Sequence, residues 1–177
     1  FEVIGVGVCY LSPIVLKNQH YRFVFRSREG VEPLTIRPRA LESGGGETAA
    51  ESRGLFVVEQ GTLELIGLPV EMKFLGGSEY PQSIVSAQDS RVRLQQCSFR
   101  GPTRLTDEYK ALIVWGTDRK FEANNTPDPY GELLIDRSYL RDDRSVIDAD
   151  LVGQHLWLVN SVFDGPRILD GDFTGGS

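Results

Sequence analysis

The chain has 177 residues, 40% of them hydrophobic, so it is long enough to bury the core of one domain. Its 25 acidic and 19 basic residues give a net charge of −6, which disfavours nucleic acid as a partner because a polyanion would be repelled. The two cysteines lie in unrelated contexts, so neither a zinc site nor a disulfide framework is expected.

The N-terminal residues 1–16 are apolar, but Glu2, Ser12 and Pro13 interrupt them well short of the roughly 20 apolar residues that a membrane span needs. This stretch therefore predicts buried strands and no membrane insertion. The sequence begins at Phe1 and shows no targeting signal, so we expect a segment excised from a larger polypeptide.

Short apolar or alternating runs recur along the rest of the chain, while helical periodicity is scarce. The runs are separated by clusters of Gly, Pro, Asp and Asn, which favour turns. Two long polar segments, residues 40–54 and 116–131, are predicted to be loops. The sequence therefore predicts an all-β protein.

An internal repeat is the strongest signal. Four segments superpose without gaps on one template, with apolar residues at positions two, four and nine and a small residue usually at position seven: 62–70, 91–99, 132–140 and 155–163. Each copy is preceded by a second apolar run, and units of this size cannot bury their own apolar faces, so they are expected to stack as a parallel solenoid. Inward ladders such as Val92 over Leu63 would form the core. The residues between them are expected to face outward: Glu64, Arg91, Arg93, Glu132 and Trp157.

These coils resemble the right-handed parallel β-helix, or pectin-lyase-like, superfamily over residues 55–165. The resemblance implies an all-β, right-handed parallel β-helix of about four to six coils. It would form one domain over 1–177, with N-terminal strands, a cap and the Gly-rich loop in 1–54, coils in 55–165 and a tail in 166–177.

The chain is also similar to degenerate accessory β-helix regions of large multidomain bacterial proteins, some of them predicted serine/threonine kinases. This similarity implies an extracytoplasmic or cell-surface location. The chain itself has no kinase motif, so any catalytic domain of such a parent would lie outside it.

Acidic residues on the outer face are the candidate catalytic set, because superfamily members that cut polysaccharides use such clusters, with calcium or as a carboxylate pair. The candidates here are Asp142, Asp143, Asp148 and Asp150, with Arg144 or Arg119 as a basic partner. Asp148 and Asp150 would point the same way on a strand. The competing interpretation is that these aspartates are turn and rim residues.

The polygalacturonase-like motifs are incomplete, which argues against catalysis. His155 is followed by Leu156 rather than Gly, and Arg167 and Ile168 are followed by Leu rather than Lys. Asp170 and Asp172 add carboxylates near the end of the sequence but complete no motif.

Aromatic residues give a second candidate site, because aromatic faces stack on sugars. The candidates for ligand binding are Trp157, Tyr130, Tyr139 and Trp115. Trp157 is preferred because it falls between the inward Leu156 and Leu158, and the alternative is that it packs under a loop. Cys97 occupies a small inward corner and is expected to be buried and inert.

The sequence thus favours a non-catalytic module that binds carbohydrate or protein, or acts as a rigid spacer, in a larger bacterial protein. The alternative is a polysaccharide lyase or glycoside hydrolase acting on acidic glycans. A third hypothesis is a structural role in which an uncapped coil stacks against another chain. No cofactor is expected, and calcium enters only through the lyase alternative.

Overall fold

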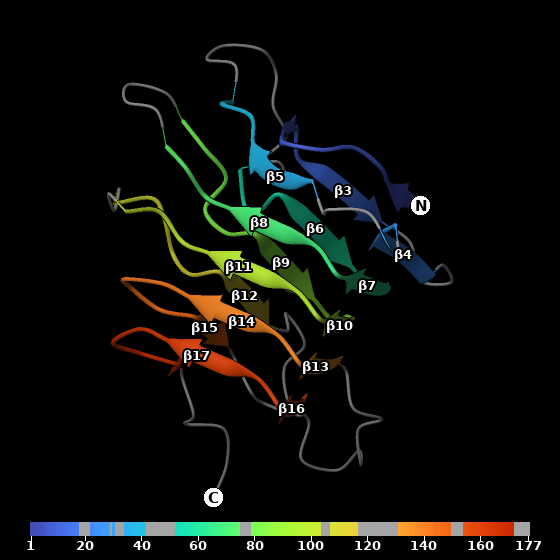
Figure 1. Cartoon of the computed structure of the whole chain (residues 1–177). Coiled ribbons are helices and arrows are strands. Elements are labelled where there is room, and N and C mark those ends of the chain that lie inside the picture. Colours follow the sequence, from blue (N-terminus) through green and yellow to red (C-terminus); the bar gives the residue numbers. More distant parts are fainter. Residues whose placement is uncertain are drawn as a thin grey trace, which may run out of the picture.

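The structure is a computed structural model of the whole chain, and it describes residues 1–17, 22–28, 30, 34–41, 52–74, 79–103, 107–116, 131–149 and 154–171. Every regular element in these ranges is a β-strand, and the strands form three parallel sheets of six strands each. They make a right-handed parallel β-helix of six coils, which confirms the predicted fold class (Figure 1). None of the described residues forms a helix long and apolar enough to span a bilayer.

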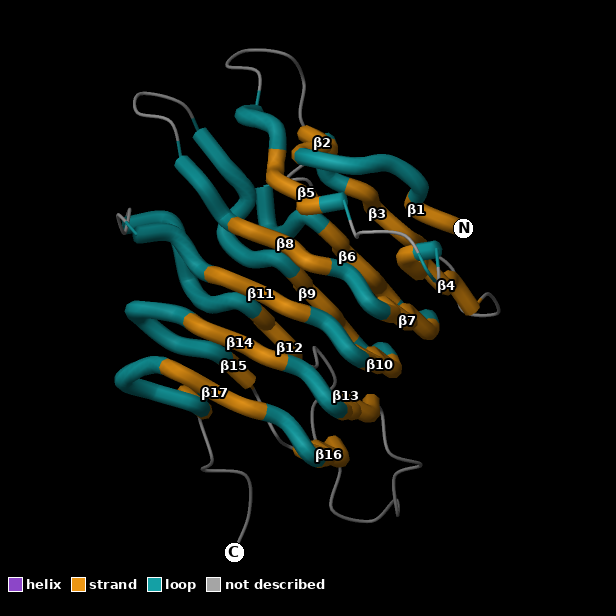
Figure 2. Tube along the Cα trace, viewed as in Figure 1, coloured by secondary structure: helices purple, strands orange, loops and turns teal. Residues whose placement is uncertain are grey.

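Each coil contributes one strand to each sheet, and the coils stack along one axis (Figure 2). Sheet A contains β1 (Glu2–Val3), β4 (Arg22–Ser27), β7 (Thr62–Ile66), β10 (Arg91–Gln95), β13 (Gly131–Asp136) and β16 (Gln154–Val159). Sheet B contains β2 (Val8–Leu11), β5 (Thr35–Pro38), β8 (Pro69–Glu71), β11 (Ser98–Arg100), β14 (Tyr139–Arg141) and β17 (Val162–Asp164). Sheet C contains β3 (Ile14–Lys17), β6 (Phe56–Glu59), β9 (Val85–Gln88), β12 (Ile113–Gly116), β15 (Ile147–Ala149) and β18 (Leu169–Asp170).

The register follows the sequence repeat. Val92 pairs with Leu63 on one side and Leu133 on the other, and Leu133 pairs with Leu156. On sheet B, Phe99 pairs with its counterparts in the neighbouring coils in the same way. Strands β1 to β5 add two further coils, so the solenoid extends beyond the range 55–165 that the repeat alone predicts.

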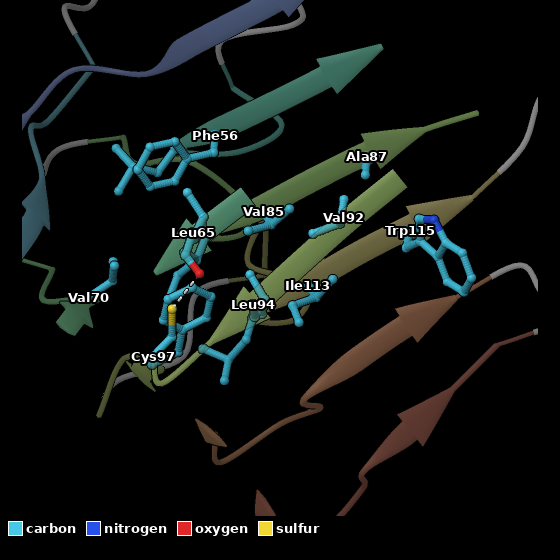
Figure 3. Close-up of a cluster of buried hydrophobic side chains, with 14 of the residues drawn as sticks. Phe56, Leu65, Val70, Val85, Ala87, Val92, Leu94, Cys97, Ile113 and Trp115 are labelled. Atoms are coloured by element: carbon cyan, nitrogen blue, oxygen red, sulfur yellow. Dashed lines mark hydrogen bonds between the residues drawn. The ribbon is translucent and has the colours of Figure 1, made fainter. Parts of the chain in front are cut away.

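The core fills the space between the three sheets, because alternate residues of every strand point inward. Leu65 and Leu94 of sheet A meet Val85 and Ile113 of sheet C in this space (Figure 3). All four side chains are buried, and each contributes roughly 1.5–3 kcal/mol of hydrophobic stabilisation. Burial of the inward ladders is therefore what holds successive coils together.

The corner between sheets A and B repeats one backbone conformation. Gln96, Arg137 and Asn160 have positive φ values of 54°, 48° and 48°, and Gly67 in the preceding coil has 64°. This left-handed bend turns the chain from one sheet to the next within a single residue. It strains every side-chain-bearing residue placed there, since only Gly adopts it without a steric cost.

The residue after three of these four bends carries a small polar side chain that hydrogen-bonds a neighbouring coil. The Oγ of Ser138 accepts a hydrogen bond from the backbone N–H of Cys97 at 3.1 Å, and the Oγ of Ser161 accepts one from Ser138 at 3.0 Å. The Cys97 thiol donates to the Leu65 carbonyl at 3.2 Å (Figure 3). Burial raises the pKa of Cys97 to about 11, so the side chain is a thiol at neutral pH, as expected for an inert position.

One outward residue is not exposed as the repeat predicts. Glu64 points away from the core but is buried, because Arg22 clamps its carboxylate with two hydrogen bonds of 2.9 and 2.6 Å. Arg93, in register on the other side, approaches the same carboxylate at 3.8 Å. Opposite charges in consecutive coils thus shield one another on the outer face of sheet A.

Replacing Gln96 by Gly is expected to raise the free energy of unfolding by roughly 0.5–1 kcal/mol, because relief of the left-handed strain exceeds the added entropy of the unfolded chain. Gln95→Gly is the matched control: Gln95 lies in β10, so the same change should cost about 1 kcal/mol. Urea denaturation of both variants measures the difference, and an equal loss of stability in both would contradict the argument.

Candidate functional site

A pocket of about 560 Å³ opens on the outer side of the last three coils. It lies at the turns that lead from sheet B into sheet C. Its volume lies in the range of small-ligand sites. The lining residues are Lys110, Asp143, Arg144, Ser145, Asp148, Pro166, Arg167 and Asp170. Three carboxylates and three cationic side chains therefore share one cavity.

The register of sheet C brings two of these carboxylates together. Asp148 of β15 pairs with Asp170 of β18, so the two residues lie on neighbouring strands about 4.8 Å apart. Both face outward, because Ile147 and Ala149 on either side of Asp148 are buried in the core. The sequence predicts Asp150 beside Asp148, but Asp150 lies outside the described residues.

The cationic wall comes from the turns that precede the strands of sheet C. Lys110 and Arg144 each stand three residues before an inward isoleucine, and these isoleucines, Ile113 and Ile147, are paired in register. The two cations therefore occupy equivalent places in consecutive coils. Arg167 follows in the last coil, and its Nη1 lies 2.8 Å from an Asp170 carboxylate oxygen.

Burial and a neighbouring like charge both act on the Asp148 carboxyl group. Burial raises its pKa, the neighbouring Asp170 raises it further, and Lys110 acts in the opposite direction. Two carboxylates so placed favour a shared proton or the approach of a hydrogen-bond donor. The pocket can therefore accept hydrogen bonds from hydroxyl groups and can also hold a proton on a carboxyl group.

Asp142 does not belong to this acidic surface, although the sequence analysis places it there. It is buried, its carboxylate accepts a hydrogen bond from the Tyr109 hydroxyl, and it accepts two more from the backbone N–H groups of Arg144 and Ser145 at 2.6 and 2.9 Å. Burial raises its pKa despite these bonds. Asp142 thus shapes the turn that presents Arg144, and the Arg144 guanidinium in turn donates to the Tyr109 carbonyl.

Two glycines make room for Asp142. A Cβ on Gly101, in the preceding coil, would lie 1.9 Å from Asp142 Oδ2, and one on Gly165, in the following coil, would lie 2.3 Å from the Asp142 carbonyl oxygen. Neither position tolerates a side chain without displacing this aspartate. The Arg-Gly and Asp-Gly turns that end the repeats are therefore needed for the rim of the pocket.

The aromatic candidates do not gather at this pocket. Trp157 is 53% exposed on the outer face of sheet A, in register with Leu134 of the preceding coil. Tyr139 lies on sheet B and donates to Asp164 at 3.2 Å. Trp115 is buried and its indole N–H donates to the Ser90 carbonyl at 3.4 Å, so it is a core residue and not part of a sugar platform.

Several residues named in the sequence analysis fall outside the described part of the chain, namely Tyr130, Asp150, Arg119 and Asp172. His155 is exposed on β16 and does not line the pocket. Within the described residues there is no group of three or more His, Cys, Asp or Glu side chains that could hold a metal ion.

Lys110 is a pocket residue that sequence reasoning missed. The four-copy repeat covers sheets A and B, whereas Lys110 belongs to the turn before sheet C. Alignment of the upstream apolar runs, with Ile113 over Ile147, would have placed Lys110 over Arg144. The signal was present in the apolar run that precedes each copy of the repeat and forms sheet C.

Comparison of the chain with protein-family models, with curated proteins and with solved structures finds no match. The fold and the pocket are therefore the observations on which a function can be argued.

Asp148→Asn should stabilise the protein at pH 7 by roughly 0.2–1 kcal/mol, because it removes like-charge repulsion between neighbouring strands. Because the pKa of Asp148 is higher in the folded than in the unfolded state, the native protein holds a proton there at pH values where the unfolded chain has lost it. Wild-type stability due to this group is therefore full below about pH 4 and is lost as the pH rises through the folded pKa.

The extra free energy of unfolding of Asp148→Asn over the wild type should accordingly shrink on acidification. Urea denaturation at pH 7 and pH 3 will measure the difference. Asp107→Asn, a change at an exposed turn, is the control for removing a surface carboxylate. A variant less stable than wild type at pH 7 would contradict the repulsion argument.

Proposed function

We propose that this β-helix is a binding module and that its ligand is a carbohydrate held in the pocket beside sheet C. The single observation that supports the proposal is the alignment of acidic and basic side chains in one cavity by the register of consecutive coils. Carboxylates accept hydrogen bonds from sugar hydroxyls, while Lys110 and Arg144 can donate to ring oxygens, hydroxyls or a sugar carboxylate.

The balance of charges favours a polar ligand over an apolar one. Asp170 is paired with Arg167, which leaves two carboxylates, Asp143 and Asp148, and two cations, Lys110 and Arg144. A ligand with many hydroxyl groups and one acidic group matches both sets. No catalytic step is required for this role, and a rigid solenoid keeps the charged groups in place before the ligand arrives.

A second part of the proposal concerns the superfamily of the chain and the larger protein that contains it. The coil template and three parallel sheets support membership of the pectin-lyase-like superfamily. We infer that the module serves a larger bacterial protein, such as a multidomain receptor-like kinase, on the extracytoplasmic side, where glycans are accessible. In such a parent the solenoid would also act as a rigid spacer.

Lys110→Ala should weaken binding of a trimer of galacturonic acid by roughly 10- to 150-fold, because it removes a charge-assisted hydrogen bond worth roughly 1.5–3 kcal/mol. Isothermal titration calorimetry of the wild type and the variant measures the change. Lys110 is exposed, so the substitution should leave the fold intact.

Trp157→Ala is the matched variant, because Trp157 is the exposed aromatic candidate on sheet A. It should leave affinity for the trimer unchanged. The opposite pattern, with loss in Trp157→Ala and none in Lys110→Ala, would move the site to the aromatic surface. A neutral trimer of glucose tests whether the acidic group of the ligand contributes.

The second candidate function is hydrolysis of an acidic glycan, and one observation favours it. Retaining glycosidases place two carboxyl groups about 5–5.5 Å apart, and Asp148 and Asp170 lie on strands with a similar spacing. The raised pKa of Asp148 suits a general acid, which must hold a proton near its working pH.

If the chain is a hydrolase, incubation with polygalacturonic acid should release new reducing ends, and Asp148→Asn should lower the rate by at least about a hundredfold. Asp107→Asn should not change the rate. Binding of the trimer without release of reducing ends by the wild type would exclude this activity on the polymer and retain the binding module.

A further inference from the structure

Charges of opposite sign face each other in consecutive coils on the outer side of the solenoid. On sheet A, Arg93 pairs in register with Glu64, and on sheet C, Lys17 pairs with Glu59. Opposite charges side by side on neighbouring strands stabilise a sheet, whereas like charges destabilise it. A like-charge pair on these outer faces therefore needs a reason other than stability.

Only two register pairs of the described strands join like charges. One is Asp148 with Asp170 on sheet C, and both residues line the pocket. The other is Arg100 of β11 with Arg141 of β14 on sheet B. Because β14 and β15 are successive strands of one coil, the two exceptions flank the same turn, the one that leads into the pocket (Figure 1).

The two arginines of sheet B present their side chains together. Both point outward, because Phe99 and Leu140 beside them are buried in the core. Their strands are neighbours about 4.8 Å apart. Arg141 has a side chain that is 58% exposed, and Arg100 is also exposed. The pair therefore offers two guanidinium groups to solvent at one place on the sheet.

The carboxylates on either side of this pair are engaged elsewhere or by one arginine alone. Asp164 lies in register with Arg141, with a carboxylate oxygen 3.6 Å from its Nε. Glu71 lies in register with Arg100, but it accepts two hydrogen bonds of 2.9 and 2.6 Å from Arg37. Within the described part of the chain the Arg100 side chain has no ion-pair or hydrogen-bond partner. Its N–H groups are free to bind two oxygens of an anion.

The arginine pair lies close to the pocket. Arg100 and Arg141 are the last residues of their strands, at the ends that lead into the turns. Arg141 precedes the pocket residue Asp143 by two positions, so their Cα atoms are at most about 7 Å apart. Asp142 between them is buried, so both of its neighbours lie on the outer side of the chain. A short sugar chain bound in the pocket can therefore extend to the two arginines.

We propose that Arg100 and Arg141 form a second anion-binding subsite, which holds an acidic group of the glycan beyond the unit in the pocket. This inference rests on the carbohydrate-binding function proposed above. It adds that the ligand is an oligomer of acidic sugars with charged groups on at least two units, one for Lys110 and Arg144 and one for the arginine pair. Guanidinium and carboxylate groups pair with two parallel hydrogen bonds, which gives geometric specificity as well as energy. A bound carboxylate also relieves the repulsion between the two arginines.

Arg100→Gln tests the subsite, because it removes the charge but keeps a polar side chain and breaks no ion pair of the described residues. Isothermal titration calorimetry with a trimer of galacturonic acid should show an affinity lower by roughly three- to tenfold, as expected for an exposed but bidentate ion pair. Affinity for monomeric galacturonic acid, which fills only the pocket, should be unchanged. Lys110→Ala, in contrast, should weaken the binding of both sugars.

Arg91→Gln is the matched control, because Arg91 is an exposed outward arginine of the same coil that faces Glu132 on sheet A. It should bind the trimer as the wild type does, and circular dichroism melts check that both glutamine variants are folded. A wild type that binds monomer and trimer equally tightly, or an Arg100→Gln variant that binds the trimer no more weakly than Arg91→Gln, would overturn the subsite and retain the pocket. A wild type that binds neither sugar would overturn the pocket and the subsite with it.

Discussion

Parallel pairing of consecutive coils, with like residues stacked on like, is the constraint on which the rest of this structure depends. Because Val92 lies between Leu63 and Leu133, the inward ladder is continuous and the core is one apolar column. The same register aligns the outward residues of consecutive coils, although these residues do not contribute to the core. Every functional argument about this protein therefore begins with which outward residues the register aligns.

The corners decide how faithfully that register is kept. At the A–B corner a left-handed residue is followed by an inward group that binds the neighbouring coil, as Ser138 does with Cys97. At the entry to sheet C the buried Asp142 performs a similar task by holding the turn around Arg144. A buried polar group at a corner thus fixes the position of an exposed charged one.

The sequence predicted sheet A well, because four copies superpose without gaps and the strands have a strict two-residue period. It could not separate Asp142 from Asp143, since both belong to a turn in which no periodicity indicates the direction of a side chain. It also misplaced Trp115, whose inward position follows from pairing with Ala87 and Ala149, small residues that leave room for an indole. Partners in neighbouring coils, Tyr109 for Asp142 and the two alanines for Trp115, accommodate these side chains in the interior.

The outward residues of sheet C, which end in Asp148 and Asp170, lie at a fixed spacing along the solenoid axis. These two residues are one strand spacing apart, about 4.8 Å, and the hydrogen bonds between the strands keep this distance constant. A flexible loop can adjust to the shape of its ligand, whereas a rigid sheet binds only a ligand whose groups match its fixed spacing. A ligand whose hydroxyl groups are spaced very differently from this interval would therefore bond to one of the two carboxylates and not to both, so that the spacing of its groups becomes a property the surface can discriminate.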